Sequence, residues 1–134
     1  MKQTLDRPSE VGIAPPDAVV LALANAPDPQ VAQRIARALV EERLAACVNI
    51  LGACESVYRW QGSIEQATEV PLLIKTTRRR WTAMAARFVE LHPYEVPELI
   101  AFAPDAILPA YAAWVIGQTR ESASLPPRGA PDRG

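Results

Sequence analysis

Along the middle of the chain, segments whose apolar residues follow the spacing of a strand alternate with segments whose apolar residues follow the spacing of a helix. Residues 19–24 form a nearly continuous apolar run, which is typical of a buried strand. Asp28 and Pro29 come next. These residue types are favoured at the N-cap and at the first position of a helix, and we expect that helix to run to about Arg43. Its apolar residues recur at helical spacing and should face the core: Val31, Ile35, Ala38 and Leu39.

Two strand-like segments joined by a turn follow this helix. Residues 45–60 are strand-like with a bend at Gly52, residues 61–63 carry a turn signal, and residues 66–76 form the return strand. Each arm would measure roughly 36–50 Å at ~3.3 Å per residue. A domain of about 100 residues has a radius of gyration of only about 13 Å. We therefore expect the hairpin to overhang its own domain and to extend the sheet of a second copy, because long exposed edges pair with other chains.

The second half of the chain repeats the alternation of helix and strand. Thr77 can cap a helix over residues 78–91, which should end at His92 because His92 precedes a proline. Residues 99–103 are a short apolar strand, and residues 109–118 have the pattern of a last helix. The order β-α-β-β-α-β with a C-terminal helix predicts an α+β, ferredoxin-like sandwich with a long central hairpin.

Proline and glycine separate this folding unit from the two ends of the chain. Six of the 13 prolines and half of the six glycines fall in residues 1–16 and 120–134. We expect both segments to be disordered tails, which leaves one domain over residues 17–119.

Charge and composition exclude several function classes. The net charge is −1, whereas nucleic-acid and anionic-membrane binders need a basic surface. No apolar run approaches the roughly 20 residues of a membrane span, and the N-terminus lacks the apolar core of a signal peptide. Two cysteines without such a signal indicate reduced thiols and a cytoplasmic protein.

An ordered set of stretches resembles the CutA divalent-cation tolerance family over about residues 18–117. In chain order the stretches are residues 45–49, residues 56–62 with 64–65, Glu69 with residues 73–76, the sequence HPYEVPE at residues 92–98, and Tyr111 with Trp114. The resemblance implies a ferredoxin-like fold, a homotrimer with an architecture like that of the PII signalling proteins, and binding of divalent cations such as copper.

His92 is the first candidate ligand for such a cation. At three positions where some family members carry a cysteine or histidine, this chain has Ala24, Arg87 and Leu91, so the resemblance implies weak binding. His92 could bind a metal ion through its imidazole. Alternatively, it ends the second helix and forms a hydrogen bond with a backbone carbonyl.

Cys47 and the carboxylates near the HPYEVPE motif could assist His92. Cys47 could supply a soft sulfur ligand, although a small residue packed in the core is the usual state of a free cysteine. Glu95 and Glu98 could coordinate a hard cation, or lie solvated or ion-paired.

Two further groups of residues are candidate binding sites. The resemblance places Trp60, Lys75, Glu98 and Tyr111 in the family's intersubunit cleft, where, with Glu95, they could hold a small polar ligand or simply pack the interface. Arg78, Arg79 and Arg80 open the second helix and could bind an anion there. They could instead be solvated or pair with Glu41 or Glu42.

The sequence gives no support for catalysis. It contains one histidine, no glycine-rich phosphate loop, no CxxC pair and no nucleophile next to a base. We therefore expect a cytoplasmic, homotrimeric CutA-type protein that is not an enzyme, binds divalent cations and takes part in the response to metal ions. The alternative is a PII-like binding or scaffolding module that uses the intersubunit cleft for a small ligand.

Overall fold

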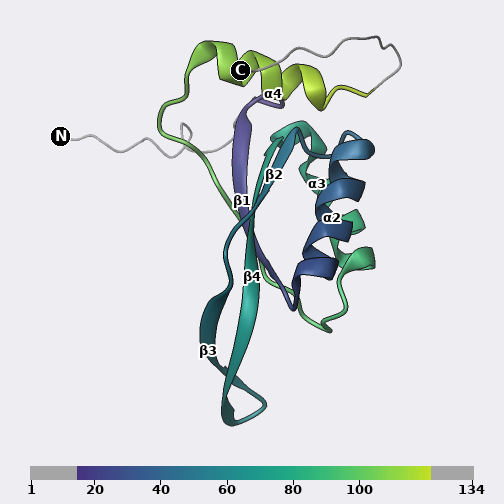
Figure 1. Ribbon diagram of the computed structural model, residues 1–134. Coiled ribbons are helices and arrows are strands. Elements are labelled where there is room, and N and C mark those ends of the chain that lie inside the picture. Colours follow the sequence, from purple (N-terminus) through teal and green to yellow (C-terminus); the bar gives the residue numbers. More distant parts are fainter. Residues whose placement is uncertain (1–14, 122–134) are drawn as a thin grey trace, which may run out of the picture.

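The computed structural model of the protein describes residues 15–121 (Figure 1). The predicted disordered tails lie outside the described residues, apart from the few residues of each that adjoin the domain. The elements are β1 (Val19–Ala26), α2 (Pro29–Glu41), β2 (Cys47–Ile50), β3 (Cys54–Trp60), β4 (Ser63–Thr77), α3 (Arg78–Leu91), β5 (Leu99–Phe102) and α4 (Pro109–Gln118).

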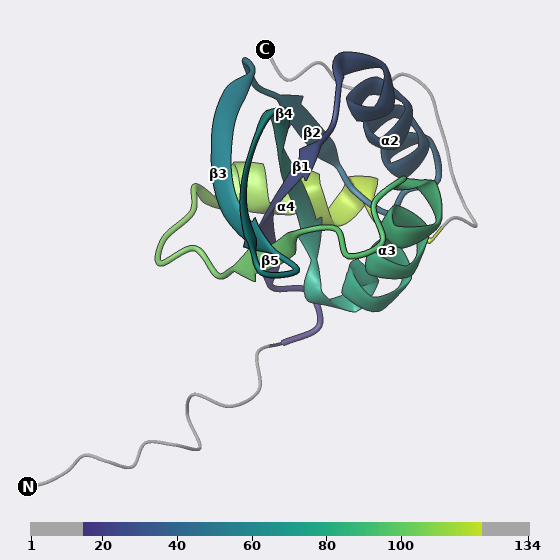
Figure 2. The same ribbon diagram turned by 90° about the horizontal axis from the view of Figure 1, so that it is seen from below.

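The strands form an antiparallel sheet in the order β2-β4-β1-β5, and β3 pairs with the first half of β4. Helices α2 and α3 lie side by side on one face of the sheet, while α4 runs across the end of the sheet where β1 begins and contacts β4 and β1 (Figure 1, Figure 2). This element order and layering confirm the α+β, ferredoxin-like fold predicted from the sequence.

Small residues on β1 let the helices approach the sheet closely. Ala22, Ala24 and Ala26 are fully buried, and Ile35 of α2 and Phe88 of α3 pack in the same core. Alternate residues of a strand point to opposite faces, so the residues of β1 between these alanines lie on the other face of the sheet. We refer to this second face as the open face, because α2 and α3 do not cover it.

The helix termini follow the sequence signals with two differences. The Asp28 carboxylate accepts a hydrogen bond from the Val31 N–H at 2.9 Å, as an N-cap residue should. Helix α2 ends at Glu41, slightly before the predicted end, because Arg43 adopts a left-handed conformation with φ 61°. Thr77 is the N-cap of α3, but its hydroxyl forms no capping hydrogen bond.

The long hairpin projects beyond the rest of the domain, as predicted (Figure 1). Only the second half of β4, from Val70 onward, pairs with β1, whereas residues 63–69 pair with β3 alone. Gln61 and Gly62 form the turn with φ values of 51° and 85°, which is the two-residue hairpin turn whose twist suits antiparallel strands. The result is a two-stranded ribbon with mostly exposed side chains.

Candidate functional site

A cavity of about 750 Å³ opens where the hairpin leaves the domain. Its walls come from the end of β1, from β3 and β4, and from the segment that follows α3. The lining residues are Asn25, Ser56, Val57, Tyr58, Trp60, Glu69, Pro93, Tyr94, Glu95, Val96 and Glu98. The cavity thus brings together three of the predicted site residues, Trp60, Glu95 and Glu98.

His92 lies behind this cavity and is not one of its lining residues. Its side chain is only 7% exposed. The Nε2 atom lies 2.7 Å from the carbonyl oxygen of Asn25, and the Nδ1 atom accepts a hydrogen bond from the Tyr94 N–H at 3.2 Å. Because a carbonyl can only accept, Nε2 carries the proton and the ring is the neutral tautomer.

Both ring nitrogens of His92 therefore have partners within the chain. This is the helix-ending arrangement with a backbone carbonyl that we gave as the alternative to metal binding. The ring also contacts Phe88 and Tyr94, with centroids 5.2 Å and 4.7 Å apart. For His92 to bind a metal ion, Nδ1 would have to exchange the Tyr94 N–H for the ion.

Two further hydrogen bonds connect the cavity walls. The Tyr94 hydroxyl donates to the Glu69 carboxylate at 3.0 Å, and the Asn25 amide donates to the Glu98 carboxylate at 3.0 Å. His92 is bonded to Asn25 and to Tyr94, so it sits at the centre of this network and orients both walls. Burial, together with the hydrogen bond to Glu69, raises the pKa of Tyr94 to about 12.

The raised pKa of Tyr94 predicts a loss of stability at alkaline pH. The phenol titrates near 10 in the unfolded chain and near 12 in the folded one, so the unfolded state loses its proton first. The contribution of Tyr94 to the free energy of unfolding is then fully present below pH 10 and falls between pH 10 and 12. Because the ring is partly exposed, solvent screening limits the fall to about 1 kcal/mol.

Denaturant unfolding of the protein and of Tyr94→Phe between pH 9 and 12 measures this effect. The difference in free energy between the two should shrink as the pH rises, since phenylalanine does not titrate. A difference that stays constant over this range would contradict it.

Cys47 and Lys75 lie outside the cavity, on the open face of the sheet. Lys75 Nζ donates to Cys47 Sγ at 3.8 Å and also to the Asn49 side-chain oxygen. Lys75 is six residues along β4 from Glu69, or about 20 Å at ~3.3 Å per residue. Neither Cys47 nor Lys75 can therefore act on a ligand in the cavity of its own chain.

The two cysteines are free and far apart. In the strand register, Cys47 lies opposite Lys75 of β4 and Cys54 lies opposite Glu69 of β4. Lys75 and Glu69 point to the same face of β4, so the bend around Gly52 brings both cysteines to that face of the sheet. The two cysteines are nevertheless about 20 Å apart, which is the distance between Lys75 and Glu69 along β4. Among residues 15–121, no group of three or more histidine, cysteine, aspartate or glutamate side chains is arranged to hold a metal ion.

Tyr111 lies on α4, away from the cavity, and stacks on Trp114 with ring centroids 5.7 Å apart. The family resemblance placed it with Trp60 in one cleft, but within a single chain the two residues lie in separate parts of the molecule. A shared cleft would need a second protomer.

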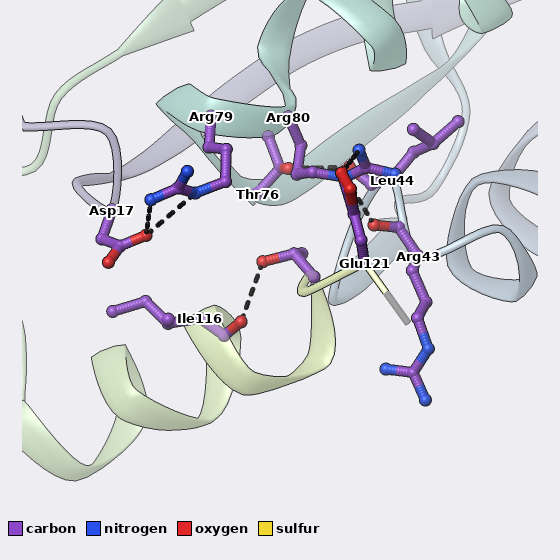
Figure 3. Close-up of polar contacts among 9 residues, drawn as sticks. Asp17, Arg43, Leu44, Thr76, Arg79, Arg80, Ile116 and Glu121 are labelled. Atoms are coloured by element: carbon purple, nitrogen blue, oxygen red, sulfur yellow. Dashed lines mark hydrogen bonds and ion pairs between the residues drawn. The ribbon is translucent and has the colours of Figure 1, made fainter. Parts of the chain in front are cut away.

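The arginines that open α3 are largely occupied by the chain itself (Figure 3). Arg79 pairs with Asp17 at 3.2 Å, and Arg80 donates to Glu121 at 2.9 Å and to the Arg43 carbonyl at 3.2 Å. The Arg78 side chain is exposed.

The N–H groups at the start of α3 are occupied as well. The backbone N–H of Arg78 donates to the Ala18 carbonyl, and that of Arg79 donates to the Pro16 carbonyl. Much of the predicted anion site therefore already has partners within the chain, and these differ from Glu41 and Glu42, the pairing that we gave as one alternative.

Sequence reasoning did not select Asn25, Tyr58, Glu69 or Tyr94 as cavity residues. Tyr94 lies in the HPYEVPE motif, and Glu69 was part of the resemblance, so both were visible as family features without a role. Asn25 gave one usable signal, since it is a polar residue inside an otherwise apolar strand.

No helix within residues 15–121 is long and apolar enough to cross a membrane.

Comparison with known proteins places the fold and the sequence in one family. The family model for the CutA1 divalent ion tolerance protein matches residues 20–118. The divalent-cation tolerance protein CutA of Thermus thermophilus is 51% identical over 79 residues, covering 59% of this chain and 77% of that protein.

Solved structures agree with this match. CutA from Xylella fastidiosa is 44% identical, with a TM-score of 0.74 over 76% of this chain and 98% of that one. The structure described as the periplasmic divalent cation tolerance protein CutA from Archaeoglobus fulgidus is 30% identical, with a TM-score of 0.74 over 76% and 99%. The chain therefore belongs to the CutA1 divalent ion tolerance protein family.

Proposed function

We propose that this protein is a homotrimer that binds divalent cations, copper among them, weakly and contributes to tolerance of metal ions. The observation that carries this proposal is the cavity, whose lining among residues 15–121 includes the acidic residues Glu69, Glu95 and Glu98 and no basic residue. Family membership supplies divalent cations as the ligand class.

The ligand chemistry explains why we expect binding to be weak. Carboxylate and amide oxygens suit hard cations, whereas tight copper sites use imidazole or thiolate. The imidazole of His92 and the thiol of Cys47 both have other partners in the chain. Copper would therefore bind through oxygen, or through His92 after Nδ1 releases the Tyr94 N–H.

Titration of Cu²⁺ and Mn²⁺ into the protein tests this proposal. We expect Glu98→Gln to weaken binding about tenfold, or about 1.4 kcal/mol, because it removes one charged oxygen ligand. Glu41→Gln on the outer surface of α2 removes the same charge far from the cavity and should leave the affinity unchanged. An affinity that collapses in His92→Ala but not in Glu98→Gln would move the site to the imidazole.

The trimer rests on surfaces that one chain leaves uncovered. A two-stranded ribbon is only marginally stable in water, and the overhanging hairpin has no third strand of its own. On β5, which is an edge strand, Ile100 and Phe102 are about half exposed on the open face. A second and third copy can cover both features, and we expect assembly through them.

We further propose that the protein binds rather than catalyses, and that it resides in the cytoplasm. Among the described residues that line the cavity, the aliphatic hydroxyl of Ser56 pairs with the Cys54 thiol and not with a base, which supports binding. The cysteines within the described residues are unpaired, which suits a reducing compartment. Fractionation of the native host would separate this location from the periplasm.

The second candidate function is a PII-like module that binds a small ligand or scaffolds a partner. A specific observation favours it: the cavity has the volume of a typical small-molecule site and includes the aromatic residues Tyr58, Trp60 and Tyr94. A single metal ion needs neither that volume nor those rings.

A further inference from the structure

We propose that the arginines at the start of α3 and after α2 bind a small anion that carries several phosphate groups, such as a triphosphate. This site is separate from the cavity, so the inference goes beyond the proposed function and does not depend on it.

The first step is a local excess of positive charge in a chain whose net charge is −1. Arg80 joins three segments, because its guanidinium donates to the Arg43 carbonyl after α2 and to the Glu121 carboxylate after α4 (Figure 3). These adjoining segments carry five arginines: Arg43, Arg78, Arg79, Arg80 and Arg120. Within residues 15–121, their ion pairs include two carboxylates, those of Asp17 and Glu121, which leaves a local charge of +3.

The acidic residues in the last turn of α2 do not compensate this charge. Glu42 pairs with Arg87 at 3.0 Å, and Glu41 pairs with Arg37 at 3.7 Å. Like charges that are held near one another repel, so an anion that binds among the arginines relieves this repulsion.

The second step is the state of the Arg80 guanidinium, whose side chain is only 15% exposed. Every nitrogen atom of a guanidinium carries a donor. Within the described residues, Nε and Nη1 of Arg80 have acceptors, whereas Nη2 has none. Because buried donors are normally paired, Nη2 is available to an oxygen-rich ligand.

The third step is that the present acidic partners compete only weakly. Asp17 pairs with Arg79 at 3.2 Å, and both side chains are about half exposed. Glu121, the partner of Arg80, is 62% exposed. Exposed ion pairs contribute little because solvent and salt screen them, so an anion with several charges can displace both carboxylates.

The geometry of the donors favours phosphate. Its oxygens match the planar fork of a guanidinium and accept two parallel hydrogen bonds from it. The backbone N–H groups of Arg78 and Arg79 already donate to carbonyls, so side chains and not the helix terminus supply the site. A chain of phosphates can contact several arginines at once, which a single phosphate cannot.

The arginines lie away from the surfaces through which we expect the chain to assemble. Helices α2 and α3 cover the face of the sheet opposite to the open face, and the hairpin projects from the other end of the domain (Figure 1, Figure 2). The side chain of Arg78 is exposed there. Neighbouring copies on the open face and the hairpin therefore leave this site accessible.

Calorimetric titration of tripolyphosphate into the full-length protein at low salt tests the inference. Arg78→Gln should weaken binding about tenfold, because the charge of Arg78 has no acidic partner within residues 15–121. Arg34→Gln is the matched control. It removes the same charge from an exposed position on α2, about two turns before the helix ends, and should change the affinity less than about twofold.

Asp17→Asn is the sharper test, because it should strengthen binding. Removing this carboxylate frees the guanidinium of Arg79, and we expect the affinity for tripolyphosphate to rise about threefold or more. Glu121→Gln should act in the same direction through Arg80. Glu90→Gln also removes a carboxylate bonded to an arginine, but at the far end of α3, and should leave the affinity unchanged.

ATP serves as a second probe, and we expect it to bind about as tightly as tripolyphosphate. Binding of ATP without binding of tripolyphosphate would mean that the nucleoside is recognised and would overturn the inference. Equal weakening by Arg78→Gln and Arg34→Gln would reduce the site to diffuse attraction by surface charge. An affinity that Asp17→Asn and Glu121→Gln leave unchanged would show that Arg79 and Arg80 do not contact the anion.

Discussion

Replacing Ile100 by glutamate is expected to leave the protein monomeric if it forms the homotrimer that we propose. Ile100 lies on the edge strand β5, is 48% exposed in the single chain, and pairs in register with Leu23 of β1 on the open face. If the open face packs against other copies, a carboxylate at this position becomes buried without a partner. The penalty of at least about 3 kcal/mol per subunit would weaken each association step by at least about 100-fold.

Val89→Glu provides a matched control for Ile100→Glu. Val89 is 56% exposed, and it lies on α3, on the side of the sheet opposite to the open face. The same substitution there should leave the assembly unchanged. Sedimentation equilibrium at micromolar concentration measures both variants, and trimers of Ile100→Glu as stable as those of the parent would show that the open face is not the interface.

Most of the fold could be predicted from the sequence because it depends on local signals. The pair Asp28 and Pro29 placed the start of α2, and the proline after His92 placed the end of α3. The overhang of the hairpin could be inferred by comparing the length of its two strand-like arms with the size of the domain. The early end of α2 could not, since it depends on a left-handed conformation at Arg43 that few non-glycine residues adopt.

The cavity was harder to predict because its residues come together only through the sheet. Asn25 and Glu98 are 73 positions apart in sequence, yet they form a hydrogen bond. Glu69 acquires its place from the register of β4, which brings it opposite Cys54 and near Tyr94. Residue type and family resemblance pointed to Trp60, Glu95 and Glu98, but no local pattern distinguishes them from Lys75 or Tyr111, which lie elsewhere.

His92 shows most clearly why residue type was insufficient. The only histidine of the chain was the natural metal-ligand candidate, and both alternatives were compatible with its place at a helix end. The structure reveals two hydrogen bonds and two ring contacts around it. A histidine so fully engaged positions other residues, and we therefore expect it to influence the cavity without lining it.

Phe88→Ala should be the most destabilising single replacement in the core and should also disturb the cavity. Phe88 is fully buried between the sheet and the helices, and truncating such a ring costs about 3–5 kcal/mol. This is a large part of the roughly 5–15 kcal/mol that stabilises a typical domain. Thermal unfolding at a fixed protein concentration measures the loss, since the midpoint of an oligomer depends on concentration.

Met84→Ala separates the general loss of packing from the specific effect on the cavity. Met84 lies one turn before Phe88 on α3 and is equally buried, so its truncation should cost about 2–5 kcal/mol. The ring of Phe88, however, contacts the His92 ring, and His92 in turn contacts Tyr94. The ¹⁵N resonances of the imidazole should show the Nε2-protonated tautomer in Met84→Ala and a mixture of tautomers in Phe88→Ala. Identical imidazole spectra in the two variants would mean that the hydrogen bonds to Asn25 and Tyr94 hold His92 without help from the core.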